Sequence, residues 1–179
     1  MNILATLVRY LPLTKVNYYS IQLEDRERCE YDRLLLKLME SEDSVYIEII
    51  EALLELFGDR GVRKEYIRQE KNAGAFIPPA NIVREFFDDI IPNDYRDLRV
   101  YLCWLNENNV VLFNGGIKTA QTAQSCPNLS KAFHEATVFC AFIKVELNLR
   151  DIELKDLWEE LQDEFCFDIP LNKLLTSTR

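Results

Sequence analysis

Two hydrophobic periodicities alternate along the chain and predict a mixture of strands and helices. Tyr19, Ile21 and Leu23 alternate with polar residues after a short lead, which indicates a half-buried strand. Apolar residues then recur at helical spacing in residues 28–40 and again in residues 45–56, with a polar break between the two segments. The second segment ends at Gly58, a typical helix C-terminal residue. The pattern therefore predicts a strand followed by a helical hairpin.

The middle of the chain favours strands. Residues 61–69 are basic and extended in character, and a strand there would place Lys64, Tyr66 and Arg68 on one face. Residues 98–105 and 110–114 are apolar runs joined by a polar turn, which predicts a pair of antiparallel strands. The segment 71–97 between these strands contains several prolines and is predicted as a long loop with a short helix near residues 81–87.

Two helices are predicted after these strands. One opens at Pro127 and carries an apolar stripe to Leu147, and the other begins at Asp151, includes Trp158 and ends before Pro170. The order of strand, two helices, three strands and two helices indicates an α+β fold. The prediction is an antiparallel sheet with an N-terminal helical hairpin and C-terminal helices, in a single domain over residues 1–179.

Composition narrows the class of protein. The chain has 179 residues, 48% hydrophobic and 28% charged, which is typical of a soluble domain with a sizeable core. No apolar run approaches the length of a bilayer span, and the first residues lack the features of a signal peptide, so a cytoplasmic location is expected. Five widely spaced cysteines and one histidine, His134, predict reduced, buried thiols and no metal site.

Charge is unevenly distributed along this acidic chain. Residues 1–59 carry six Lys/Arg against twelve Asp/Glu, and residues 135–179 carry five against ten. Residues 60–134 between them carry ten Lys/Arg against eight Asp/Glu, and no acid occurs in residues 108–134. A locally non-acidic surface on an acidic protein is compatible with an anionic ligand.

The order of elements and several short motifs resemble a known family. The motifs are Arg99-Val-Tyr101, Val110-Val-Leu-Phe113 and Gly115-Gly-Ile-Lys118-Thr119, preceded by Tyr66 and its basic neighbours. With these the chain resembles the RelE/HigB-like toxins of bacterial type II toxin–antitoxin systems. The segment 116–124 also looks like the Gly-x-x-Lys-Thr-x-Lys-Thr ending of the HigB branch. The resemblance covers residues 16–148 and leaves residues 149–179 as a helical extension.

That resemblance implies a ribosome-dependent endoribonuclease that cleaves messenger RNA and is neutralised by a cognate antitoxin protein. The ribose 2′-OH attacks the adjacent phosphate, so the enzyme needs cations at the phosphate, a group that moves protons, and no cofactor. Carried over to this chain, the catalytic residues are Arg99, Lys118 and Tyr66. The residues that bind substrate are Lys64, Arg68 and Tyr101.

The chain departs from the family pattern after Lys118. Residues 119–123 supply neither another basic residue nor a Tyr or His, and His134 is expected to be solvent-facing or helix-capping rather than catalytic. An acidic pI of about 4.8 also disfavours RNA binding, because phosphate contacts supply most nucleic-acid affinity. The alternative is a catalytically eroded toxin fold that acts as a non-enzymatic protein-binding module through its acidic helices and the Trp158 segment.

Overall fold

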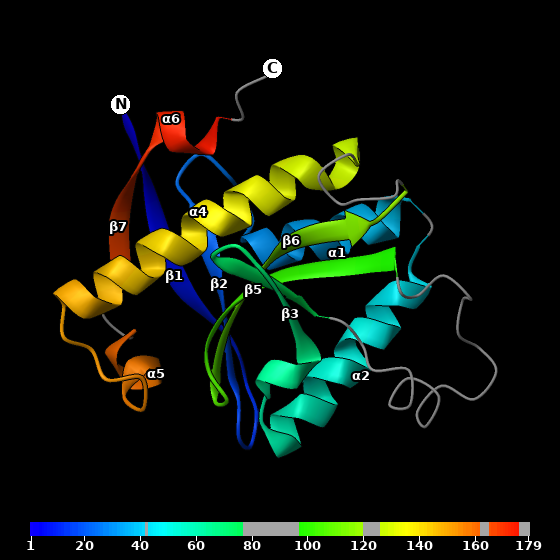
Figure 1. Cartoon of the computed structure of the whole chain (residues 1–179), viewed down its shortest axis with the longest axis horizontal. Coiled ribbons are helices and arrows are strands. Elements are labelled where there is room, and N and C mark those ends of the chain that lie inside the picture. Colours follow the sequence, from blue (N-terminus) through cyan, green and yellow to red (C-terminus); the bar gives the residue numbers. More distant parts are fainter. Residues whose placement is uncertain (42, 77–96, 120–125, 162–164, 176–179) are drawn as a thin grey trace.

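A single seven-stranded sheet organises the chain, with helices on both of its faces (Figure 1). The computed structural model describes residues 1–41, 43–76, 97–119, 126–161 and 165–175. The strands are β1 (Asn2–Pro12), β2 (Asn17–Leu23), β3 (Ile67–Glu70), β4 (Ala73–Phe76), β5 (Leu98–Asn106), β6 (Asn109–Ile117) and β7 (Phe165–Pro170). The helices are α1 (Glu30–Glu40), α2 (Val45–Arg60), the 3₁₀ helix η1 (Lys64–Tyr66), α4 (Pro127–Leu149), α5 (Leu157–Glu160) and α6 (Leu171–Leu174).

The sheet is mixed rather than antiparallel. Its strand order is β3-β4-β5-β6-β2-β1-β7, and every neighbouring pair is antiparallel except β2 and β6, which run parallel. The parallel pair arises because the chain leaves the sheet after β2, crosses one face through α1 and α2, and re-enters at the far edge. The prediction of an antiparallel sheet was therefore wrong at one interface, while the α+β class is confirmed.

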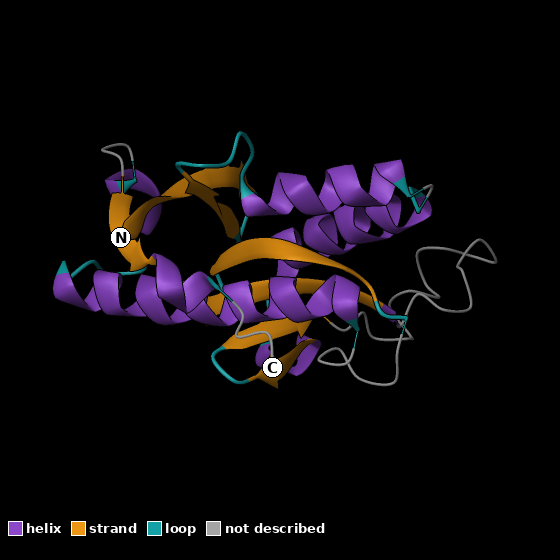
Figure 2. Cartoon of the chain, turned by 90° about the horizontal axis from the view of Figure 1, so that it is seen from above, coloured by secondary structure: helices purple, strands orange, loops and turns teal. Residues whose placement is uncertain are grey.

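Two hydrophobic cores lie on opposite faces of the sheet. Figure 2 shows helices on both sides of the sheet. The first packs α4 against one face and includes Tyr101, Phe113 and Phe139. The second packs α1 and α2 against the other face and includes Leu34, Leu53 and Leu112. Successive residues of β5 and β6 thus point into different cores, which explains why both strands appear in the sequence as continuous apolar runs.

The N-terminal hairpin consists of the strands β1 and β2, so the prediction of an N-terminal helical hairpin was wrong. The predicted lead is the eleven-residue strand β1, which pairs with β2, and the expected helices follow as α1 and α2. Ile3, Ala5 and Leu7 are buried while their neighbours are more exposed, so β1 has the period-2 pattern of a strand with one face on the core. In the sequence this alternation is hard to recognise, because residues 3–8 are apolar on both faces except for Thr6.

The C-terminal region also differs from the prediction. The helix expected from Asp151 is reduced to the four-residue α5, and β7 follows it and pairs with β1. Residues 149–179 therefore supply an edge strand rather than a helical extension. Phe165, Phe167 and Ile169 point into the α4 core at strand spacing, and this pattern overrides the helical one. The helix predicted near residues 81–87 lies outside the described residues.

Gly115 is expected to be essential for stability, because β5 passes very close to it. A Cβ atom on Gly115 would lie 1.9 Å from the carbonyl oxygen of Arg99, a backbone atom of the paired strand. Gly115→Ala should therefore force β5 and β6 apart and lower the free energy of unfolding by about 3 kcal/mol. Urea denaturation followed by circular dichroism measures this change. A loss smaller than about 1 kcal/mol would show that the two strands separate easily at this point.

Candidate functional site

Arg99 and Lys118 come together at one end of the β5–β6 hairpin. Arg99 pairs with Gly116, and the Lys118 amide donates a 2.9 Å hydrogen bond to the Asp97 carbonyl oxygen. Alternation along both strands directs the two side chains to the face covered by α4, where such diagonal neighbours lie about 7–8 Å apart. This part of the predicted site is present as a pair of neighbouring cations.

The two cations are partly shielded from solvent. Arg99 is 7% exposed, and its Nη1 donates a 2.9 Å hydrogen bond to the Leu98 carbonyl oxygen. The Lys118 side chain is 22% exposed, and its Nζ lies 3.7 Å from Oδ1 of Asp97, a weak ion pair by distance. Lys118 is therefore the more exposed of the two cations, and Arg99 lies beneath the surface.

A third cation, Lys37 of α1, reaches the same hairpin end and was not predicted from the sequence. Its Nζ donates to the Gly115 carbonyl oxygen at 2.7 Å and to Oδ1 of Asn114 at 3.3 Å. Asn114 is 6% exposed, and its Oδ1 also accepts a 2.8 Å hydrogen bond from the Gly115 amide. Lys37 is thus anchored to the backbone beside Gly116.

The environment lowers the pKa of Lys37. Burial is the main cause, because it disfavours the charged form, and the nearby Arg33 acts in the same direction. Glu30 and Glu135 oppose the shift but do not cancel it. Lys37 therefore has a larger neutral fraction at a given pH than an ordinary lysine, a property that suits it to proton transfer.

The N-terminus of α4 faces the same corner of the molecule. Thr119 Oγ1 lies 3.3 Å from the Sγ atom of Cys126, the residue that precedes the helix. A Cβ atom on Gly116 would lie 3.4 Å from Cδ2 of Leu129 in the first turn. That turn contains no acidic residue, so the positive end of the helix dipole is not neutralised by its own side chains. Figure 1 shows the ends of β6 and α4 close together.

Gly116 lies between these groups and places no side chain there. Its φ is +149°, a conformation that favours glycine, and the position of its missing Cβ is 3.8 Å from the Lys37 Nζ and 3.4 Å from Leu129. A side chain here would occupy the space between the Lys37 amine and the helix N-terminus. Lys37, Arg99, Lys118 and the N-terminus of α4 are named the hairpin-end site below.

Lys64 and Tyr66 lie elsewhere. The strand predicted over residues 61–69 is wrong in its first part, because Lys64–Tyr66 is the 3₁₀ helix η1 and β3 begins only at Ile67. Tyr66 stacks on Phe57 of α2, with ring centroids 4.9 Å apart. Lys64 Nζ lies 4.8 Å from the ring centroid of Trp104, near the opposite end of β5 from Arg99.

Arg68 and Tyr101 are not part of the hairpin-end site either. Arg68 is an exposed residue of β3 opposite Ala75, which in turn lies opposite Tyr101. At ordinary strand spacing, its Cα lies about 10 Å from that of Tyr101. Tyr101 is 0% exposed, and its ring packs 5.6 Å from that of Phe133 on α4. Tyr101 is therefore a core residue here.

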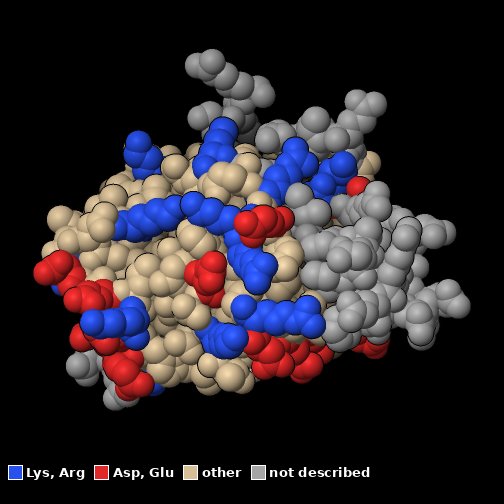
Figure 3. Space-filling view, turned by 60° about the horizontal axis from the view of Figure 1, so that its bottom comes forward, with Lys and Arg blue, Asp and Glu red and all other residues tan. Residues whose placement is uncertain are grey.

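Exposed basic side chains follow one another in the segment 60–71, which also contains the exposed Glu65. Residues 60–71 contribute five exposed cations, which are Arg60, Arg63, Lys64, Arg68 and Lys71. The segment is tied to the β5–β6 turn by a 2.8 Å hydrogen bond from the Val62 amide to the Glu107 carbonyl oxygen. Figure 3 shows Lys and Arg side chains in a band across this face. An extended anionic chain can contact this band over several residues.

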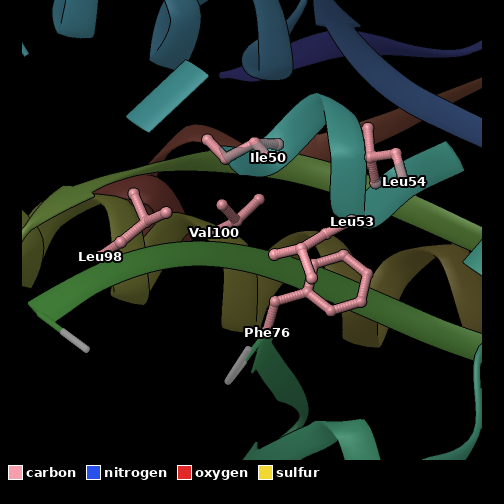
Figure 4. Close-up of a pocket in the computed structure, with 6 residues that line it drawn as sticks. All are labelled: Ile50, Leu53, Leu54, Phe76, Leu98 and Val100. Atoms are coloured by element: carbon pink, nitrogen blue, oxygen red, sulfur yellow. The ribbon is translucent and has the colours of Figure 1, made fainter. Parts of the chain in front are cut away.

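Two further features provide no catalytic group. The cavity of Figure 4 has a volume of about 10 Å³ and a wholly apolar lining that includes Ile50, Leu53 and Phe76, which is typical of a dry packing defect. His134 places Nε2 2.7 Å from the carbonyl oxygen of Lys173 and so tethers α4 to α6. Both features are explained by packing.

The comparisons with known proteins do not assign a function to this chain, so the functional argument rests on its residues and their geometry. This chain matches no protein-family model, no curated protein and no solved structure. Within the described ranges, no three His, Cys, Asp or Glu side chains are grouped so as to hold a metal ion. None of the helices in these ranges combines the length and apolar character needed to cross a bilayer.

Proposed function

We propose that this protein is a toxin-like endoribonuclease of a bacterial type II toxin–antitoxin module, which cleaves messenger RNA on the ribosome. The observation that supports this function best is that Arg99 and Lys118 are neighbours at the end of the β5–β6 hairpin, while Lys37 contacts the backbone of the same hairpin end at Gly115. Such a grouping of positive side chains in a chain of net charge −9 favours a binding site for a phosphate.

The proposed reaction is an internal transfer of the phosphoryl group. The 2′ oxygen of the ribose forms a bond to the adjacent phosphorus, and the bond from phosphorus to the 5′ oxygen breaks. The products are a 2′,3′-cyclic phosphate and a 5′-hydroxyl, with one proton leaving the 2′-OH and one arriving at the 5′ oxygen. Arg99 and Lys118 stabilise the charge that develops on the phosphoryl oxygens.

Lys37 is the proposed proton acceptor, in place of Tyr66. A neutral lysine amine keeps two N–H groups, which match its two acceptors, the Gly115 carbonyl oxygen and Oδ1 of Asn114. Its lone pair is then available to take the proton of the 2′-OH. Tyr66 has no part in this chemistry, because it stacks on Phe57 in another region of the molecule.

The RNA strand outside the cleaved bond is proposed to follow the basic band. Lys64 and Arg68 retain the role of holding substrate, since both are exposed and belong to the residue 60–71 segment. The ribosome and messenger RNA remain the proposed targets, and an antitoxin the proposed neutralising partner.

Lys118→Ala is expected to abolish toxicity. Removing one preorganised cation from a developing oxyanion lowers the rate by about 10²–10³-fold, so induction of the variant should no longer arrest growth. Growth curves after induced expression in a bacterium lacking an antitoxin measure this effect. Lys144→Ala removes an exposed lysine from α4, away from the hairpin-end site, and should arrest growth like the wild type.

The burial of two expected site residues favours a second candidate function, a non-enzymatic protein-binding module. Arg99 is 7% exposed and Tyr101 is 0% exposed, so little of the surface of either side chain is open to a ligand. For such a module, Lys118→Ala would leave the growth phenotype intact while the message stays uncleaved. That result would replace the nuclease with the binding module.

A further inference from the structure

An open pocket lies between β1, α1 and α2. Of the hairpin-end residues, only Lys37 is close in sequence to the residues that line this pocket. Its volume is about 230 Å³, and Tyr10, Leu11, Tyr31, Leu35 and Leu54 form its aromatic and aliphatic wall. Two glutamates of α2, Glu51 and Glu55, complete the lining. This size and wall suit one bulky apolar side chain.

The wall of the pocket is held in a fixed arrangement. Tyr10 sits at a β-bulge in β1, where the register with β2 shifts between Arg9 and Leu11. Its ring packs edge-on against Tyr31 at 4.9 Å, and its hydroxyl donates a 2.8 Å hydrogen bond to Oδ1 of Asp32. Because both contacts lock the ring, the opening is built into the fold and needs little rearrangement to be filled.

The rim of the pocket is acidic. Glu51 and Glu55 lie one turn apart on the same face of α2, and both are exposed. Asp32 adds a third carboxylate beside Tyr10. Among the described residues, no lysine or arginine forms an ion pair with Glu51 or Glu55. The rim therefore attracts positive charge that the described part of the chain does not supply.

An apolar stripe leads away from the pocket along α1. Leu35 lines the pocket, while Leu36 and Met39 are 37% and 63% exposed on the same helix. Leu36 and Met39 are one turn apart, and Met39 is one turn beyond Leu35, so these side chains extend the apolar surface beyond the pocket. Pocket and stripe together form a surface suited to a helical segment.

We infer that the pocket between β1, α1 and α2 is a docking site for a basic amphipathic helix of a partner protein. One bulky apolar side chain of that helix enters the pocket between Tyr10 and Leu54, and its Lys or Arg residues face Glu51 and Glu55. Charge complementarity selects this occupant, because an acidic or neutral helix leaves both glutamates facing it without a counter-charge. This inference does not depend on the nuclease function.

The test uses a fluorescein-labelled synthetic helix of about 15 residues that carries a leucine stripe and flanking arginines. Fluorescence anisotropy should show saturable binding to the full-length protein. Glu51→Lys with Glu55→Lys should weaken the dissociation constant by about tenfold or more. The matched control, Glu160→Lys with Asp168→Lys, changes the net charge equally at exposed C-terminal positions and should leave the affinity within about twofold of wild type.

A second probe separates docking from general attraction between charges. A peptide with the same arginines but serines in place of the leucines should bind at least about tenfold more weakly, since it cannot fill the pocket. Equal binding of the two peptides, an equal loss in the control variant, or no binding of the leucine peptide would each overturn the docking site. RNA cleavage by the wild type would be unaffected by these outcomes, so the two proposals fail separately.

Discussion

Replacing Arg26 with alanine is expected to lower the free energy of unfolding by about 3–5 kcal/mol. Arg26 follows β2, and its guanidinium contacts Glu30 of α1 and lies 2.7 Å from Oε1 of Glu135 on α4. Those two glutamates are 0% and 3% exposed, so nearby cations rather than water stabilise the charges of both carboxylates. Removing Arg26 leaves buried negative charge without its main partner, which is costly in a region of low dielectric.

Urea denaturation at neutral pH measures this loss, with two controls. Arg28→Ala removes an exposed arginine two residues further along and should change stability by less than about 0.5 kcal/mol. Arg26→Met combined with Glu135→Met removes both charges and should recover much of the stability. Arg33 Nη1 lies 2.8 Å from Glu30, and Lys131 lies 3.9 Å from Glu135. If Arg26→Ala is as stable as Arg28→Ala, these two cations are enough to stabilise the buried carboxylates, which would contradict the prediction.

Replacing Lys37 is expected to reduce RNA cleavage by about 100-fold or more, because general-base catalysis contributes at least that much. Lys37→Met removes the amine. Lys37→Arg keeps a cation and hydrogen-bond donors but cannot lose its proton at neutral pH. If Lys37→Arg is as inactive as Lys37→Met, Lys37 acts by proton transfer. If Lys37→Arg is active, Lys37 acts only through its positive charge.

The pH dependence of cleavage follows from the direction of the Lys37 shift. The base acts in its neutral form, so the single-turnover rate should rise with pH and reach its plateau at a lower pH than an ordinary lysine would allow. Stability should change in the same direction. The unfolded chain binds more protons between the lowered folded pKa and the unfolded pKa, so stability rises with pH across that window. Lys37→Met removes this dependence on pH, and Lys144→Met retains it.

The sequence predicted the fold class and most elements because their hydrophobic periods are long and clear. The two helices α1 and α2, the β5–β6 hairpin and the start of α4 at Pro127 were all predicted. Errors fell on β1 and β7, which pair with each other in the sheet, on η1, where a strand was predicted, and on β4, which lies in the segment 71–97 predicted as a loop. The partner of β7 lies more than 150 residues away, and no local pattern reports such a pairing, whereas β1 also pairs with the adjacent β2.

The candidate site was predicted only in part, because one of its residues comes from a distant part of the sequence. Arg99 and Lys118 belong to one hairpin, so their proximity follows from local strand pairing. Lys37 comes from a helix and meets Gly115 only through the packing of α1 on β6, which requires the tertiary structure. Its position beside the apolar residues Leu34 and Leu38 of α1 was the one available signal, and many surface lysines share it.

Mapping RNA ends after incubation of the purified protein with programmed ribosomes tests the central claim most directly. The wild type should produce fragments that end in a 2′,3′-cyclic phosphate and a 5′-hydroxyl, Lys118→Ala should produce about 100-fold fewer, and Lys144→Ala should match the wild type. Intact messages with folded wild-type protein, or equal cleavage by Lys118→Ala, would contradict catalysis at the hairpin-end site.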